Sequence, residues 1–143
     1  PKPSSAASDV YKRQIKDMSS ETPDTPTYIF VRDKISKYKL NIDINSKAVK
    51  NGIIEVNTII KFSDQPEILK KAHFEITYTS IVKVDEKVSD KKEMEKIILC
   101  DVPNKIYPDL ERIFLNLLSD SGYPGIKFEK KVDFTELYKQ RAN

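Results

Sequence analysis

The chain has 143 residues with a formal net charge of +3, and 38% of its residues are hydrophobic. This size and composition fit one domain with a core of its own. Three glycines are too few for a glycine-rich phosphate loop, the lone Cys100 excludes an internal disulfide, and the lone His73 excludes a paired-histidine metal site. Acidic and basic residues are interspersed, unlike the clustered basic charge of a nucleic-acid-binding protein. Since no apolar run approaches the ~18 residues of a membrane span, we expect no insertion into a membrane.

Two other kinds of function stay open from these residues. Cys100 and His73 would form the nucleophile and base of a hydrolase if the fold brought them together; otherwise they are an ordinary helix cysteine and strand histidine. An RNA-binding sheet would need aromatic rings that face outward beside lysines. Tyr38, between Lys37 and Lys39, is the one cluster of that kind.

The N-terminal part of the chain is its least regular part. We expect residues 1–9 to be a disordered leader and residues 10–143 to form a single domain. Val10–Met18 contains β-branched and aromatic residues and predicts a first strand. Glu21–Pro26 contains two prolines, which cannot donate to a strand ladder, so we expect a connector there.

A regular alternation of apolar and polar side chains begins after Lys37. It covers residues 38–44, 54–62 and 73–84, with the period of strands that have one buried face. Asn51-Gly52 predicts a two-residue turn, and residues 63–67 predict a second turn. Such short connections make neighbouring strands antiparallel, so the pattern predicts a meander.

The pattern becomes helical after the last strand. Charged residues favour a helix from about Asp90, which Val102-Pro103-Asn104 should interrupt. We expect a second helix over Pro108–Ser121, because a proline in the first turn costs no hydrogen bond. A last short helix should begin near Asp133 and point three side chains inward: Phe134, Leu137 and Tyr138. The order of elements predicts an α+β fold, a four-stranded antiparallel meander with C-terminal helices packed on one face.

Three stretches of this sequence, Lys16–Pro26, Tyr38–Asp43 and Pro103–Arg112, have the motifs of one known family, and through them the chain resembles the protein-export chaperone family SecB. Lys16–Pro26 (KDMSSETPDTP) is similar to the K-D-(I/L)-S-x-E-x-P-x-A-P pattern that follows the family's first strand. Tyr38–Asp43 (YKLNID) resembles the family's next strand, V-K-L-D-L-D. The third stretch is Pro103–Arg112 (PNKIYPDLER), similar to P-x-x-(I/L)-F-P-x-A-R, and it continues into Gly122–Pro124 and Val132–Tyr138. The order and spacing of the motifs agree over residues 16–141.

The resemblance implies a cytoplasmic, ATP-independent holdase that is not an enzyme and needs no cofactor or metal. Such a chaperone binds unfolded precursor proteins and passes them to the SecA motor for export, and it works as a homotetramer, a dimer of dimers. The closest alternative is a SecB-like chaperone dedicated to one partner, such as an antitoxin. Two departures from the family stand out. The net charge of +3 differs from a strongly acidic norm, and residues 85–96 are charged where the family is mostly apolar.

The resemblance also implies roles for individual residues. Three carboxylates align with positions that contact SecA, and the alternative is ordinary surface charge: Asp17, Glu21 and Glu75. The client groove would involve positions on the second strand and other apolar residues, with the hydrophobic core as the alternative: Phe30, Tyr38, Leu40, Ile42, Phe74 and Tyr107. The helix after Pro108 has more apolar residues than one sheet face needs, so we expect some at an oligomer interface: Leu110, Ile113, Phe114, Leu117 and Leu118.

Overall fold

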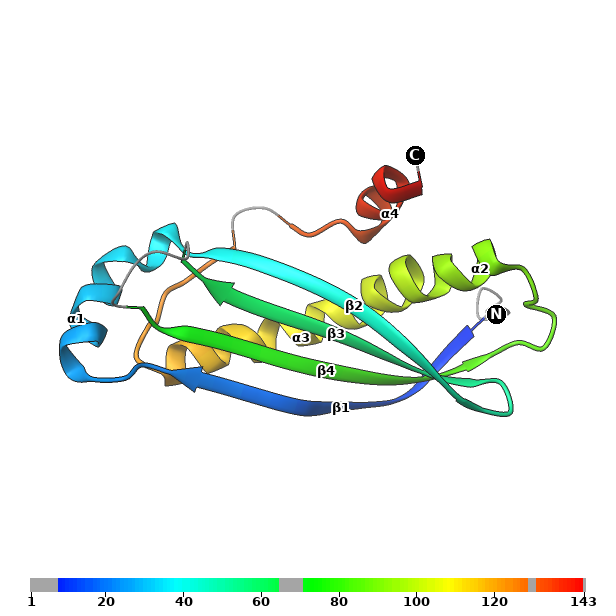
Figure 1. Cartoon of the computed structure of the whole chain (residues 1–143), viewed down its shortest axis with the longest axis horizontal. Coiled ribbons are helices and arrows are strands. Elements are labelled where there is room, and N and C mark those ends of the chain that lie inside the picture. The colour runs from blue at the N-terminus through cyan, green and yellow to red at the C-terminus, as the bar shows by residue number, and fades with distance from the viewer. Residues whose placement is uncertain (1–7, 65–70, 129–130, 143) are drawn as a thin grey trace.

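A four-stranded antiparallel sheet forms the body of the protein (Figure 1). The structure is a computed structural model that describes residues 8–64, 71–128 and 131–142. The strands are β1 (Ser8–Glu21), β2 (Lys39–Lys50), β3 (Ile53–Ser63) and β4 (His73–Val84). β2, β3 and β4 form a meander and β1 pairs with the other side of β4, so the order is β1-β4-β3-β2. β1 and β2 are therefore the two edges of the sheet.

The sheet has a covered face and an open face. β3 buries its even-numbered residues from Ile54 to Phe62, and β4 buries its even-numbered residues from Phe74 to Val84. We call the face that carries these side chains the inner face, and the opposite one the outer face. The predicted turn at Asn51-Gly52 joins β2 to β3, and both of its residues have positive φ angles, 50° and 76°. Asparagine and glycine are the residues that tolerate this conformation best.

β1 pairs with β4 through two shifts in register, and the second shift decides which face its later side chains occupy. It falls between Ile15 and Asp17. Ile15 lies opposite Tyr78 on the inner face, whereas Asp17 lies opposite Thr77 on the outer face. Because a regular strand alternates faces, the two residues would share one face without this bulge.

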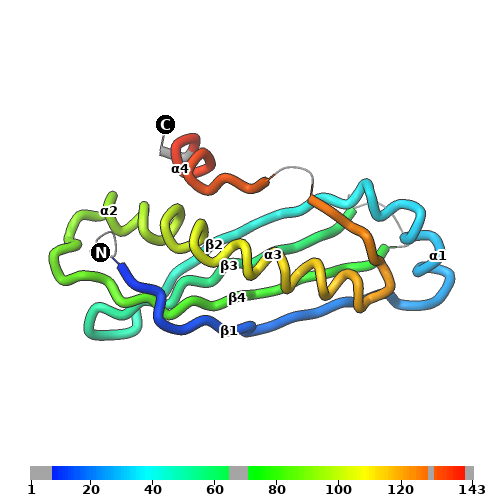
Figure 2. Tube along the Cα trace, turned by 180° about the vertical axis from the view of Figure 1, so that it is seen from behind, coloured from blue at the N-terminus to red at the C-terminus, as the bar shows by residue number. Residues whose placement is uncertain are grey.

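A continuous helical segment crosses the inner face (Figure 2). It consists of α2 (Lys91–Lys96), the π-helical η3 (Ile97–Asp101) and α3 (Val102–Asp120). The expected interruption at residues 102–104 is therefore wrong, because Pro103 falls in the first turn of α3, where its missing N–H costs little. Pro108, expected to begin a helix, lies inside α3. Packing of the buried helix face offsets the hydrogen bond that this proline removes.

The core lies between α3 and the inner face. Ile106, Leu110, Phe114 and Leu118 repeat at about one helical turn and each have 0% exposed surface. They share one cluster with inner-face residues, among them Ile60, Phe62, Phe74 and Ile76. A smaller cluster forms where η3 crosses the other end of the sheet, and it contains Ile54, Val56, Val82, Val84, Ile97 and Val102.

The chain between β1 and β2 is helical rather than a plain connector. α1 (Thr25–Lys34) and the 3-10 turn η2 (Ile35–Lys37) lie at one end of the sheet (Figure 1). The Asp24 carboxylate accepts a hydrogen bond of 2.8 Å from the Thr27 N–H and so caps α1. Pro26, in the first turn, favours a helix start at the place where it was expected to act only as a breaker.

α4 (Phe134–Ala142) lies beside η3 near the C-terminal end of the chain. Phe134 points inward as predicted, with 1% of its surface exposed, and Tyr138 is half-buried. Leu137 lines a hollow between α4 and β2, on the inward side as predicted, but 49% of its surface is still exposed.

The ends of the expected elements differ slightly from the observed ones. β1 begins at Ser8, inside the expected leader of residues 1–9, and the rest of that leader lies outside the described residues. Of the predicted turn at 63–67, residues 65–67 also lie outside them. Within the described residues, no helix is long and apolar enough to cross a membrane.

Candidate functional site

An apolar groove runs beside the start of β2. Its volume is about 780 Å³, within the range of ligand-binding pockets. One wall comes from η2 and β2. The other comes from the segment after α3, which crosses beside α1 to the start of β2 (Figure 2). The apolar residues that line this β2 groove are Ile35, Tyr38, Leu40, Phe62, Ile126 and Phe128.

Tyr38 is held in the groove wall by its hydroxyl group. The hydroxyl oxygen accepts a hydrogen bond of 2.9 Å from the Ala72 N–H, and the hydroxyl donates to the Ala72 carbonyl at 3.2 Å. Burial raises the pKa of the Tyr38 hydroxyl, so the neutral form that can make both bonds is favoured. The ring thus has a fixed position between the start of β2 and the start of β4.

The opposite wall is packed on the core through aromatic contacts. The Phe128 ring lies edge-on to Phe62, with centroids 5.7 Å apart, and stacks on Phe114 at 6.2 Å. Phe62 in turn lies 5.4 Å from Tyr38. Such aromatic pairs favour defined ring geometries. The groove is therefore bounded by side chains that the core holds in place.

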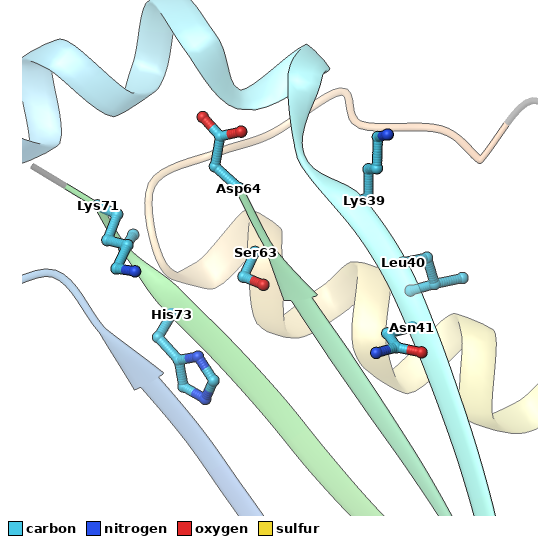
Figure 3. A pocket seen from close by; sticks show the side chains of 8 residues that line it. Lys39, Leu40, Asn41, Ser63, Asp64, Lys71 and His73 are labelled. Atoms are coloured by element: carbon cyan, nitrogen blue, oxygen red, sulfur yellow. The ribbon is translucent and has the colours of Figure 1, made fainter. Parts of the chain in front are cut away.

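A polar hollow of about 510 Å³ adjoins the groove and shares Leu40 with it. Figure 3 shows Lys39 on β2 at one side of this hollow, and Lys71 and His73 at the other. Ser63 and Asp64, at the end of β3, lie between them (Figure 3). An occupant of the groove that extended past Leu40 would meet this polar surface.

A second, smaller apolar hollow of about 250 Å³ lies further along β2, beneath α4. Its apolar lining is Ile42, Ile44, Leu99, Phe134, Leu137 and Tyr138. α4 is held there by the Phe134 ring, 5.4 Å from that of Tyr107, and by a 3.0 Å hydrogen bond from the Asn104 amide to the Thr135 hydroxyl. Half-buried apolar side chains thus continue along β2 from one hollow to the next.

Comparison with known proteins places this architecture in a family. The family model described as preprotein translocase subunit SecB matches residues 2–143. The chain belongs to the SecB family. It is 97% identical over 129 residues to a protein-export protein SecB of Pelagibacter ubique, covering 90% of this chain and 92% of that protein. It is 24% identical to the protein-export protein SecB of Methylocella silvestris, over 90% of this chain and 78% of that one.

Solved structures agree on the fold. A SecB-like chaperone of Mycobacterium tuberculosis, solved with a peptide of an antitoxin, superposes with a TM-score of 0.66 at 12% identity, over 90% of this chain and 93% of that one. A protein of unknown function from Streptococcus agalactiae gives 0.53 at 6% identity, over 86% and 97%. With the family, these likenesses identify the protein as a SecB-like chaperone with the predicted α+β fold.

The groove residues expected from the SecB resemblance divide into two groups. Tyr38 and Leu40 line the β2 groove, and Ile42 lines the hollow beneath α4. Phe74 is completely buried on the inner face and Tyr107 is 7% exposed under α4, so the structure places both in the core. Phe30 is exposed on α1, outside the groove lining, and the Lys34 ammonium lies 5.9 Å from the centre of its ring. These three residues are not part of the site that we propose.

Sequence reasoning missed most of one groove wall. Ile126 and Phe128 follow Gly125 at every second position, a spacing that indicates an extended segment with one apolar side. Two alternating apolar residues are too few to predict an extended segment from sequence. Ile35 and Phe62 line the groove too, and nothing in their local pattern distinguishes them from core residues.

The three carboxylates expected to bind SecA share the outer face. Asp17 lies opposite Thr77, Ser19 opposite Glu75 and Glu21 opposite His73, and such pairs have their side chains on the same side of a sheet. The His73 ring nitrogen Nε2 lies 3.2 Å from the Glu75 carboxylate. The register places the three carboxylates on one face of the sheet. Their role in SecA binding stays a prediction.

The residues expected at an oligomer interface also divide. Leu110, Phe114 and Leu118 have no exposed surface and belong to the core of the chain, because they face the inner side of the sheet. Ile113 and Leu117 are half-buried on a neighbouring face of α3. Of the five residues, these two therefore remain candidates for an oligomer interface.

The structure argues against the two functions that the sequence left open. Cys100 is buried in η3 on the inner side, with its sulfur 3.4 Å from the Thr135 hydroxyl, whereas His73 is on the outer face beside Glu75. The sheet separates the two, so they form no nucleophile–base pair. Tyr38 is 7% exposed, so its ring is not available for base stacking between Lys37 and Lys39.

Proposed function

We propose that this SecB-like protein is a cytoplasmic holdase that binds unfolded precursor proteins without ATP and delivers them to SecA for export. The observation that carries the proposal is the apolar β2 groove, open beside an edge strand and continued by the hollow beneath α4. An unfolded client presents apolar side chains and unpaired backbone, and an open apolar groove accommodates the side chains.

The edge strand supplies the second element of recognition. β2 has β3 as its neighbour on one side, and its other side has no strand among the described residues. An edge strand presents backbone N–H and C=O groups that an extended segment can pair with. Backbone pairing is independent of client sequence, and the groove favours apolar side chains, so the combination suits a chaperone with many clients.

We propose further that the working form is a homotetramer, a dimer of dimers. Ile15 and Met18 on the inner face of β1 are 44% and 45% exposed, and both are apolar. They lie between two links to α3, an ion pair from Arg13 to Asp109 and a hydroxyl contact from Ser20 to Ser121. An exposed apolar patch beside an edge strand is an association site.

Delivery to SecA is proposed to use Asp17, Glu21 and Glu75 on the outer face. This face is open because the helical segment covers the inner one (Figure 2). A client held beside β2 and a motor bound to the β1 and β4 side of the outer face would therefore occupy different parts of the molecule. The holdase cycle that we propose involves no cofactor.

Suppression of aggregation tests the holdase function. A chemically unfolded client is diluted into buffer without nucleotide, and light scattering is followed with the wild type and with a Leu40→Asp, Ile126→Asp double variant. Both residues line the groove, and a carboxylate there disfavours apolar client residues. We expect the wild type to slow aggregation and the variant to lose most of this effect. The matched control is Ile29→Asp, Val49→Asp, two exposed positions outside the groove.

Two results would contradict the proposal. One is failure of the wild type to protect any of several unrelated clients, and the other is equal protection by the folded groove variant. Circular dichroism and native mass show whether the variant is folded. Protection confined to a single client would instead indicate the dedicated chaperone that the sequence leaves as an alternative.

A further inference from the structure

The charged residue among the described residues that line the β2 groove is a lysine. Lys127 lines the groove. Lys39 lies between the groove residues Tyr38 and Leu40 on the same edge of the sheet, but it pairs with Ser63, so its side chain is on the outer side of that edge. No carboxylate is among the described residues that line the groove. A client segment lying in it would therefore have its ends close to lysine side chains.

Neither lysine is neutralised by another of the described residues. Both are exposed, and no carboxylate among the described residues is within ion-pair distance of Lys39 or Lys127. This differs from Lys16, which has Glu55 at 3.4 Å. A lysine without a partner can pair with a charge on a ligand without first giving up an internal contact.

The adjoining polar hollow has more positive than negative charges in its lining. Lys39 and Lys71 contribute two positive charges to its lining and Asp64 one negative charge, while His73 adds a donor or acceptor (Figure 3). The hollow shares Leu40 with the groove. A client segment that passed around the β2 edge at Leu40 would therefore meet a lining with more positive than negative charges. The chain as a whole has a net charge of +3, which also favours negatively charged client segments.

We infer that the β2 groove selects client segments in which apolar or aromatic residues are bordered by aspartate or glutamate. The inference rests on the proposed holdase function and adds a preference for one client chemistry. Apolar side chains would occupy the groove between Tyr38 and Ile126, and a carboxylate at the border of the segment would lie near Lys39 or Lys127. A segment bordered by lysine or arginine would place like charges together, which disfavours binding.

Three peptides of one length test this selection. They share a central apolar and aromatic stretch and differ only in the flanking residues, which are aspartate, serine or lysine. Fluorescence anisotropy gives the dissociation constant for each at low and at high salt. We expect the aspartate-flanked peptide to bind about fivefold more tightly than the serine-flanked one at low salt, as two exposed ion pairs allow. The lysine-flanked peptide should bind most weakly, and the differences should shrink at high salt.

A charge-reversed variant, Lys39→Glu, Lys127→Glu, tests whether these two lysines cause the preference. It should reverse the order of the aspartate- and lysine-flanked peptides and leave the serine-flanked one nearly unchanged. The control Lys12→Glu, Lys91→Glu changes net charge equally at two exposed lysines outside the groove, and it should keep the wild-type order.

The outcomes separate this inference from the function on which it rests. Equal binding of all three peptides, or tightest binding of the lysine-flanked one, overturns the charge preference and leaves apolar client binding intact. Reversal of the order in the control variant also overturns it, because net charge and not the groove would then decide. If no peptide binds, including the serine-flanked one, the proposed client groove itself is contradicted.

Discussion

The Tyr38 hydroxyl makes both a donor and an acceptor bond with the backbone of Ala72, at 3.2 and 2.9 Å. This pair of bonds ties the residue before β2 to the residue before β4. It also places the ring that lines the β2 groove. A change at one oxygen atom should therefore affect the stability of the whole groove wall.

Replacing Tyr38 by phenylalanine should lower the free energy of unfolding by about 1–3 kcal/mol, because the Ala72 N–H and C=O lose a buried partner. Denaturant titration measures the change. Tyr11→Phe is the matched control, since Tyr11 is 48% exposed, and it should have almost no effect. An unchanged midpoint for Tyr38→Phe would mean that the two bonds contribute nothing net to stability.

Stability should fall at alkaline pH through Tyr38 and Tyr107. Burial raises the pKa of both hydroxyls above the ordinary value of 10.0, so the folded state keeps protons that the unfolded state releases. This contribution is complete below about pH 10 and is lost as pH rises from there through the folded pKa values. Unfolding titrations at pH 9, 10 and 11 should show the decline. In a Tyr38→Phe, Tyr107→Phe variant the free energy of unfolding should decline less over this pH range. An equal decline would mean that these two hydroxyls do not cause it.

Tyr107→Phe alone should be neutral or stabilising, by up to about 1 kcal/mol. The Tyr107 hydroxyl is buried and has no hydrogen-bond partner among the described residues, while the ring contact with Phe134 would remain. Tyr123→Phe is the comparison, since its hydroxyl lies 3.1 Å from that of Thr22 and its loss should reduce stability. Denaturant midpoints of the two variants decide this. A clear loss of stability in Tyr107→Phe would show that its hydroxyl has a partner in solution.

Ile15→Asp together with Met18→Asp should reduce the native mass of the proposed tetramer, whose wild-type value is four times 16.5 kDa. Both side chains are exposed in the single chain, so their replacement should leave the monomer folded. Light scattering after size-exclusion chromatography measures the mass, and Ile29→Asp, Val49→Asp serves as control. A wild type that is monomeric at all concentrations, or a variant of unchanged mass, would exclude this patch as the interface.

Sequence patterns predicted the parts of the fold that depend on local periodicity. The alternation in residues 54–62 and 73–84 identified β3 and β4, and the sequence Asn51-Gly52 identified the turn between β2 and β3. The helical break at Pro103 was predicted wrongly, because a proline can also occupy the first turn of a segment that follows π-helical residues. Local propensity does not distinguish these two situations.

The site was harder to predict than the fold, because it depends on contacts between distant segments. Apolar residues of one strand look alike in sequence, and only the path of the chain after α3 decides that Leu40 lines a groove while Phe74 is enclosed. The face of Asp17 was equally hidden. It depends on the register shift after Ile15, which no local pattern in β1 indicates.

That register shift leads to the prediction for SecA. With Asp17 on the outer face, it shares a surface with Glu21 and Glu75, but this surface is not purely acidic. Lys61 lies directly opposite Glu75 in the β3–β4 pairing, and the His73 ring is 3.2 Å from the same carboxylate. Attraction to a basic surface of SecA should therefore be modest.

An Asp17→Lys, Glu75→Lys variant should bind SecA several-fold more weakly than the wild type at low salt, because it places positive charge where a basic partner would dock. The difference should nearly vanish at high salt, since exposed charges are screened over about 8 Å at physiological ionic strength. The control Asp33→Lys, Glu86→Lys makes the same change in net charge at exposed positions on α1 and in the loop after β4, and it should bind like the wild type. Calorimetric or optical titration of SecA against the three proteins, each of the same native mass, measures the affinities. If the patch variant binds as tightly as the control, the three carboxylates are ordinary surface charge and SecA must dock elsewhere on the molecule.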